Sequence, residues 1–146
     1  MKRFFNYWLP VVIWSAMILS AANDSLSAQN SGHWLRTILP FLDDAQLAFV
    51  NFLIRKLTHI LIYAILGTLA FRAVRSEREG WRRSWWLAAI AIACAVAIAD
   101  ESLQGTTALR GGNVWDVLLD TVAAAIASFG VRRPCRRFGS RGLVAR

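Results

Sequence analysis

The chain has 146 residues, of which 56% are hydrophobic and 18% are charged, with a formal net charge of +8. This composition excludes a disordered chain, which would be poor in apolar residues, and two cysteines are too few to hold a disulfide scaffold of this size. A large soluble enzyme would need a longer and more polar chain, and a soluble nucleic-acid-binding protein would explain the charge but not the apolarity. A small inner-membrane protein with basic cytoplasmic loops explains both features.

Four apolar stretches, taken in chain order, predict four transmembrane helices. The expected spans cover about residues 4–22, 55–74, 84–104 and 114–131. The last two stretches are alanine-rich and too long for strands, which favours helices. A soluble bundle of buried helices is the alternative, but such helices need polar outer faces, and residues 85–99 carry no charge. The sequence therefore predicts an all-α membrane protein, with a transmembrane domain over residues 1–131 and a basic tail at residues 132–146.

The first apolar stretch has a second interpretation. The basic residues Lys2 and Arg3, the apolar run and the small residues at 20–22 also fit a signal peptide with a cleavage site. Cleavage would leave three spans in the mature protein and would not change the orientation of the others.

The segment between the first two expected spans is long for a small protein. Residues 34–53 are largely apolar, but Pro40, Asp43 and Asp44 interrupt them. Pro40 should break any helix there, and Asp43 or Asp44 could cap a new helix that begins near Ala45. We therefore expect an interfacial or re-entrant segment before the second helix.

The distribution of lysine and arginine predicts the orientation. Of the 17 basic residues, 13 lie before the first span, between the end of the second span at Arg72 and the start of the third, or after the fourth. Basic residues mark cytoplasmic loops, so both termini are expected in the cytoplasm, and the loops at 23–55 and 105–113 are expected outside. This topology explains the arginines of residues 132–137 without a nucleic-acid partner. Cys94 lies within a span and Cys135 in the tail, so they are not expected to pair.

Polar and ionisable residues fall at one depth, near the outer ends of three expected spans. Helical spacings of i, i+3, i+4 and i+7 place them on one face of each helix. They are Arg55, Lys56, His59 and Tyr63 from the second span, Asp100, Glu101 and Gln104 from the third, Asn113, Asp116 and Asp120 from the fourth, and Arg110 from the last loop. Because a bilayer disfavours such groups, they should face one another or a wet cavity.

A structural role for these residues is one interpretation. Charges near helix ends often pair to fix helix packing, and the pairs Lys56 with Glu101 and Arg110 with Asp116 would do so. The number of polar groups favours a functional role, because each ionisable group inside a membrane costs about 2.5–3.5 kcal/mol by insertion scales. Packing alone rarely requires so many of them.

Metal binding and nucleophilic catalysis are two further alternatives for the same region. His59, Asp100, Asp116 and Asp120 together offer one imidazole and several hard oxygen ligands. Their spacing matches no tight metal-binding motif, so neither a metal nor another cofactor is expected. Ser102 lies beside Glu101, but no sequence context marks it as a nucleophile.

The order and spacing of these motifs resemble the VanZ-like family of small multi-pass membrane proteins. The resemblance covers about half of the chain and rests on Arg55-Lys56-x-x-His59-x-x-x-Tyr63-x-x-Leu66-Gly67, Asp100-Glu101-x-x-Gln104, Arg110 and Asp116-x-x-x-Asp120. The chain departs from the family's common pattern at Leu109, Asp120 and Ala124. The resemblance implies a protein of the cell envelope, linked through the family's namesake to tolerance of the glycopeptide antibiotic teicoplanin, without implying a settled reaction.

Two functions fit this cluster, and both have membrane lipids as partners. In the first, an outward-facing cavity binds the headgroup of a lipid, a lipid-linked glycan or a lipidated antibiotic at the outer leaflet, with anionic groups held by Lys56 and Arg110. In the second, an enzyme acts on such a headgroup, with His59, Glu101 or Asp100 as acid or base. The expected binding residues are Arg55, Lys56, Tyr63, Gln104, Arg110, Asp116 and Asp120. A proton-coupled carrier is least favoured, because four short helices would need to associate as a homo-oligomer for alternating access.

Overall fold

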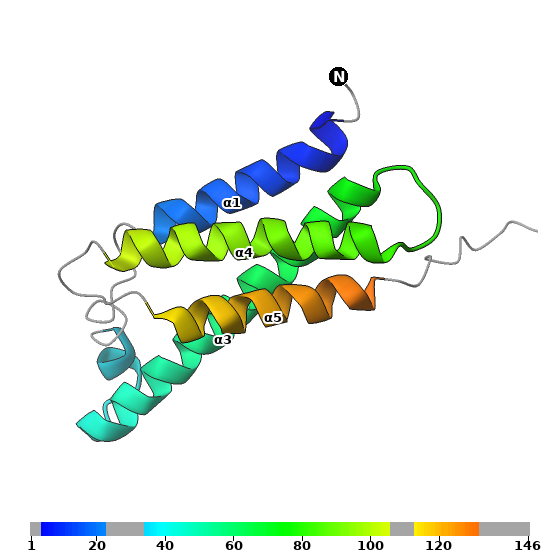
Figure 1. The fold of residues 1–146 in the computed structure, drawn as a ribbon. Coiled ribbons are helices and arrows are strands. Elements are labelled where there is room, and N and C mark those ends of the chain that lie inside the picture. Colours follow the sequence, from blue (N-terminus) through cyan, green and yellow to red (C-terminus); the bar gives the residue numbers. More distant parts are fainter. Residues whose placement is uncertain (1–3, 23–33, 106–112, 132–146) are drawn as a thin grey trace, which may run out of the picture.

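The computed structural model describes residues 4–22, 34–105 and 113–131, and these residues are helical apart from short connections (Figure 1). A π-helical turn, η1 (Phe4–Trp8), leads into α1 (Leu9–Ala22). After a short helical segment at residues 34–38 come α3 (Asp44–Arg75), α4 (Arg83–Gly105) and α5 (Val114–Gly130). The expectation of an all-helical chain is confirmed.

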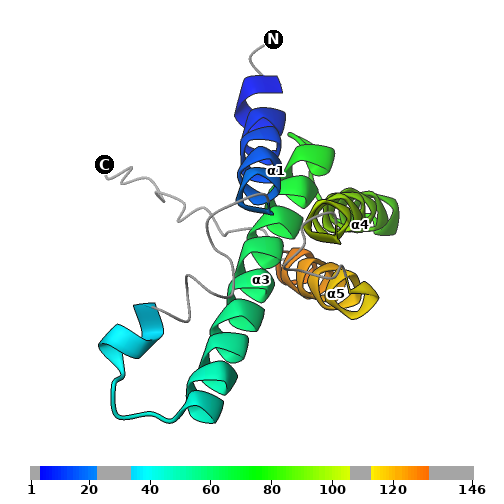
Figure 2. The same ribbon diagram turned by 90° about the vertical axis from the view of Figure 1, so that its left-hand side faces the viewer.

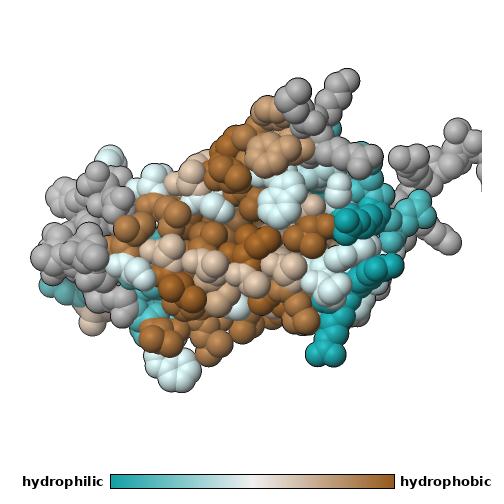
Figure 3. All heavy atoms as spheres, turned by 45° about the horizontal axis from the view of Figure 1, so that its top comes forward, coloured by the Kyte–Doolittle hydropathy of each residue, from teal (hydrophilic) through white to brown (hydrophobic). Residues whose placement is uncertain are grey.

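Three of the helical segments are long and apolar enough to cross a membrane, namely Phe4–Ala21, Asp44–Arg75 and Arg83–Gln104. Large hydrophobic side chains on their outer faces are exposed, including Met17, Leu61 and Ile98. The face drawn in Figure 3 carries a broad hydrophobic band, with hydrophilic residues at the end that holds the α3–α4 connection. α5 has 17 residues, fewer than the roughly 20 that span a bilayer comfortably. The chain is therefore a multi-pass membrane protein, and a fourth span at α5 stays a prediction.

α3 begins at a capping box. The Asp43 carboxylate accepts a hydrogen bond from the Gln46 backbone N–H at 2.7 Å, and the Gln46 side-chain oxygen accepts one from the Asp43 N–H at 3.2 Å. This arrangement satisfies two backbone donors at the helix start. The expectation that Asp43 or Asp44 caps a helix is confirmed, and Pro40 lies in the break before it.

α3 is longer than the second expected span. No proline follows the cap before Arg75, so the helix continues for 32 residues, or about 48 Å at 1.5 Å per residue. Its N-terminal end extends beyond α4 and α5 (Figures 1 and 2). Residues from Asp44 onward therefore belong to α3, so the expected boundary near residue 53 is wrong, and an interfacial or re-entrant segment over residues 34–43 stays a prediction.

α3 is the central helix and packs against α1, α4 and α5 (Figure 2). α3 lies very close to α5 at Gly67, where an added Cβ would lie 2.7 Å from the Cα of Ala124. Small residues let membrane helices approach closely and pack backbone against backbone. We call this contact between Gly67 and Ala124 the seam. His59 and Asp120 precede the two seam residues on helices that run in the same direction, so the seam brings these polar residues together.

The end of the bundle that holds the α3–α4 connection is aromatic and basic. Trp86 donates its indole N–H to the Ala125 carbonyl at 3.1 Å, and its ring packs edge-on against Phe129 with centroids 5.8 Å apart. The guanidinium groups of Arg78 and Arg82 lie 5.6 and 5.3 Å from the centroid of the Trp85 ring. We call this region the aromatic end.

Candidate functional site

The polar residues gather at the opposite end of the bundle, which we call the polar end. It is formed by the N-terminal half of α3, the C-terminal end of α4 and the N-terminal end of α5, which lie side by side (Figures 1 and 2). The structure brings together Lys56, His59 and Tyr63 from α3, Asp100 and Glu101 from α4, and Asn113, Asp116 and Asp120 from α5. Two layers can be distinguished, a buried one and one that lines a cavity.

The first layer consists of the buried side chains of Tyr63, Asp100 and Asp120 together with the partly buried His59, and we call it the inner cluster. His59 Nδ1 lies 3.1 Å from Asp120 Oδ2, and the Tyr63 hydroxyl donates to Asp100 Oδ2 at 3.1 Å. Tyr63 and Asp120 are fully buried, and Asp100 is 2% exposed. The rings of His59 and Tyr63 are stacked, with centroids 6.3 Å apart. Three helices thus hold an imidazole, a phenol and two carboxylates in one buried network.

The outer layer contains an ion pair between Lys56 and Asp116, both partly buried. A structural interpretation of the sequence had suggested an ion pair between Lys56 and Glu101, but Lys56 pairs with Asp116 instead. Glu101 instead accepts the backbone N–H of Asn113 at 2.9 Å and so holds the start of α5. The difference follows from the packing, since α3 and α5 lie side by side and bring Lys56 to Asp116. The other suggested pair involves Arg110, which lies outside the described residues.

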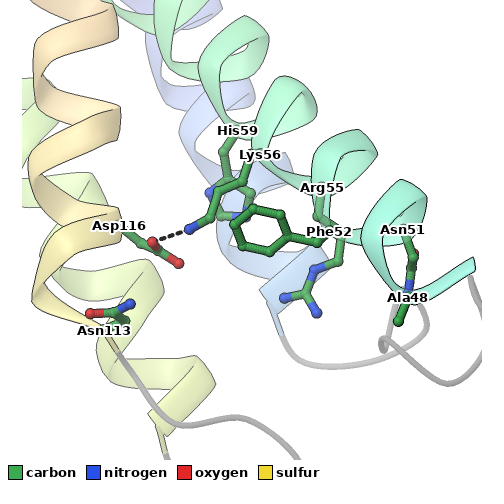
Figure 4. Close-up of a pocket in the computed structure, with 8 residues that line it drawn as sticks. All are labelled: Ala48, Asn51, Phe52, Arg55, Lys56, His59, Asn113 and Asp116. Atoms are coloured by element: carbon green, nitrogen blue, oxygen red, sulfur yellow. Dashed lines mark hydrogen bonds and ion pairs between the residues drawn. The ribbon is translucent and has the colours of Figure 1, made fainter. Parts of the chain in front are cut away.

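A cavity of about 410 Å³ opens beside this ion pair (Figure 4). It is lined by Ala48, Asn51, Phe52, Arg55, Lys56 and His59 of α3 and by Asn113 and Asp116 at the start of α5. In Figure 4 the Lys56 side chain points across the cavity toward Asp116, and the Phe52 ring lies next to it. The Lys56 ammonium is 5.5 Å from that ring's centroid. The wall therefore combines two cationic side chains with amides, a carboxylate and an aromatic ring.

Ala48, Asn51 and Phe52 were missed by the sequence analysis. The second span was expected to begin near residue 55, so the residues before it were assigned to a separate interfacial or re-entrant segment. The signal that could have found them is the capping motif at Asp43 and Gln46. Once α3 starts there, steps of three and four residues continue the polar face backward from His59 through Arg55 and Phe52 to Ala48.

Three further residues discussed from the sequence lie on α4. Gln104 is buried near the end of α4, at 6% exposure. The Ser102 hydroxyl donates to the Ile98 carbonyl of its own helix at 2.6 Å and is exposed, an arrangement that does not mark a nucleophile. Cys94 is a free cysteine in α4, and Cys135 lies outside the described residues.

Two carboxylate oxygens in the polar end lack a partner. Asp120 Oδ1 and Glu101 Oε1 are buried and accept no hydrogen bond from the part of the chain that the structure describes. Buried polar atoms of this kind are uncommon and often accompany a binding or catalytic role. The arrangement suits two kinds of chemistry, because an imidazole beside a buried carboxylate can move a proton, and clustered carboxylates can hold a cation.

The model of the VanZ/LLP1 family matches residues 5–133, which is most of the chain. No curated protein and no solved structure matches it.

Proposed function

We propose that this chain, which belongs to the VanZ/LLP1 family and is a multi-pass membrane protein, binds the headgroup of a lipid or lipid-linked molecule in its polar cavity. The observation that carries the proposal is the cavity at the polar end. Its volume of about 410 Å³ falls within the range of about 300–1,000 Å³ that is typical of small-molecule sites. Arg55 and Lys56 supply positive charge for a phosphate or carboxylate, and Asn51 and Asn113 supply amide groups for hydroxyls.

A lipid is favoured over a free solute by the surface beside the cavity. Phe49, Phe52, Leu53 and Leu57 lie on the same part of α3 and are 62%, 53%, 42% and 58% exposed. In a membrane, such a surface contacts acyl chains, so a ligand with its headgroup in the cavity would have its chains along α3. The ligand would then enter sideways from the leaflet without crossing the bundle.

The distribution of arginines supports an assignment of the membrane leaflet that the cavity faces. Arg72 and Arg75 end α3, and Arg83 begins α4, all at the aromatic end. Basic residues favour the cytoplasmic side, so the aromatic end is assigned to the cytoplasm together with both termini. The cavity then opens toward the outer leaflet of the cell membrane.

A binding experiment with short-chain lipids tests the proposal. Purified protein in detergent is titrated calorimetrically with dihexanoyl phosphatidylglycerol and, separately, with dihexanoyl phosphatidylcholine. We expect preference for the anionic lipid, and the double variant Arg55→Gln, Lys56→Gln should weaken its binding by about tenfold or more, since charge-assisted hydrogen bonds are lost. The matched control is Arg72→Gln, Arg83→Gln, which removes two exposed cations at the other end. Equal affinity for both lipids, or equal effects of the two double variants, would contradict the proposal.

Tolerance of teicoplanin is the cellular consequence we attach to this binding, through the family to which the chain belongs. A lipidated glycopeptide and a lipid headgroup would compete for the same outward cavity. The test expresses the wild type and the Arg55→Gln, Lys56→Gln variant in a teicoplanin-sensitive host. We expect the wild type to raise the inhibitory concentration of teicoplanin and the variant to fail; equal sensitivity of both strains would separate the cavity from antibiotic tolerance.

A second candidate function is an enzyme that performs acid–base chemistry on such a headgroup. The observation that favours it is that His59 lines the cavity and also contacts buried Asp120, as a general base held by a carboxylate would. Incubation with an envelope lipid extract, followed by mass spectrometry, tests this function. His59→Gln should stop a conversion that the wild type performs while leaving binding in place. A wild-type protein that converts no envelope lipid would exclude the enzyme.

A further inference from the structure

Three potential metal ligands converge in the inner cluster. His59 of α3, Asp100 of α4 and Asp120 of α5 each offer one ligand atom, and these atoms lie within 4.8 Å of one another. Ligand atoms bound to a first-row ion lie about 2.0–2.2 Å from it, and therefore up to about 4.4 Å apart. Small side-chain movements would bring all three atoms onto one ion. The residues are far apart in sequence, which is why their spacing matched no metal motif.

The unpartnered oxygen of Asp120 is a second, independent observation. Its side chain is fully buried, and Oδ1 accepts no hydrogen bond within the described residues, although Oδ2 lies beside His59. A buried carboxylate oxygen left without a partner costs free energy. A cation held by the cluster would satisfy it.

The charge balance points in the same direction. Asp100 and Asp120 are both buried, and none of the lysines and arginines that the structure describes forms an ion pair with either of them. Lys56, which lies one helical turn before His59 on α3, forms its ion pair with Asp116 rather than with Asp100 or Asp120. Two neighbouring carboxylates in a low-dielectric interior repel each other strongly. A divalent cation would offset both charges.

The surroundings supply an outer shell and an entry path. The Tyr63 hydroxyl donates to Asp100, as residues behind a metal ligand commonly do to orient it. His59 belongs to the cavity wall as well as to the inner cluster, so an ion could reach the cluster through the cavity. A candidate metal site should have both features.

We propose that His59, Asp100 and Asp120 bind a divalent transition-metal cation, such as Mn²⁺ or Zn²⁺, beneath the cavity. The imidazole favours a transition metal over Mg²⁺ or Ca²⁺, which prefer oxygen ligands alone. The site goes beyond headgroup binding and does not depend on it, because none of the three ligands is a cationic residue of the cavity wall.

A manganese titration tests the site. The full-length protein is purified in detergent, stripped with a chelator, transferred to chelator-free buffer and titrated with Mn²⁺ while electron paramagnetic resonance measures the free ion. We expect about one Mn²⁺ per chain, displaced by Zn²⁺. Asp120→Asn should weaken binding by at least about tenfold, and Tyr63→Phe, which removes only the outer-shell hydroxyl, by roughly 10–100-fold.

The matched control is Glu79→Gln, which removes an exposed carboxylate at the aromatic end, away from the inner cluster and the cavity. It should leave Mn²⁺ binding unchanged. A wild type that binds no Mn²⁺, or equal losses in Glu79→Gln and Asp120→Asn, would overturn the site, because the latter result indicates only general attraction to acidic residues. If Asp120→Asn fails to fold, unchanged affinity in Tyr63→Phe would overturn it, and the weakening given above would support it.

Discussion

The two ends of the bundle differ in where their charged side chains lie. At the aromatic end, Arg78 and Arg82 are exposed and lie over the Trp85 ring. At the polar end, Asp100 and Asp120 are buried between helices. The seam at Gly67 and Ala124 lies between the two ends. If the polar end is kept for binding, as proposed above, the seam and the aromatic end should account for more of the fold's stability than the polar end does.

The largest effect is expected at the seam, because it supports both ends. Gly67→Val places a branched side chain where even a Cβ would lie 2.7 Å from the Cα of Ala124. Overpacking typically costs 1–3 kcal/mol, and a backbone neighbour cannot rotate away, so we expect a loss of about 3 kcal/mol in the free energy of unfolding. Unfolding of the detergent-solubilised protein by increasing dodecyl sulfate, followed by circular dichroism, measures it.

Gly130→Ala is the control for the seam. A Cβ added at Gly130, on α5 like Ala124, meets nothing within 4 Å, so stability should not fall. Equal stability of Gly67→Val and the wild type would mean that the helices separate without cost. The seam would then not be what links the two ends.

An intermediate effect is expected at the aromatic end. Trp86→Ala removes the hydrogen bond to the Ala125 carbonyl and the ring contacts with Trp81 and Phe129. Full truncation of a buried tryptophan costs about 3–5 kcal/mol, and Trp86 is only partly buried, so we expect about 2 kcal/mol. The same unfolding assay measures it.

Lipid binding at the cavity should persist in Trp86→Ala, because the cavity lies at the other end. Lipid binding is thus a second measurement that distinguishes the two ends independently of stability. Loss of binding in a folded Trp86→Ala protein would show that the two ends are coupled.

The fold and the site differ in how far the sequence could predict them. Apolar stretches and the cap at Asp43 are local signals, so the helices and the start of α3 followed from them. The helical spacing of Lys56, His59 and Tyr63 is equally local and placed them on one face. The choice of Asp116 as the partner of Lys56 depends on how α3 and α5 cross, and that crossing depends on a backbone contact at Gly67, which no spacing along one helix reveals.

The smallest effect on stability is expected at the inner cluster. Asp120→Asn keeps the shape of the side chain and an oxygen or amide near His59, while it removes a buried charge. The weakened contact with His59 is offset by removal of a buried charge that is costly to keep away from water, so we expect the free energy of unfolding, measured in chelator, to change by less than about 1 kcal/mol. Mn²⁺ binding by the same variant in chelator-free buffer should nevertheless be weaker by at least about tenfold.

The control for Asp120→Asn is Leu66→Ala, which truncates a fully buried side chain of α3 and should cost about 2–5 kcal/mol in the same assay. It establishes that the assay detects a packing loss near the cluster. A loss of about 3–5 kcal/mol in Asp120→Asn, the cost typical of breaking a buried pair, would show that the inner cluster holds the helices together. The polar end would then stabilise the fold as the aromatic end does, and loss of binding in its variants would reflect unfolding. A stable Asp120→Asn protein assigns the buried carboxylate to function, because selection keeps costly groups that folding does not need only where binding or catalysis uses them.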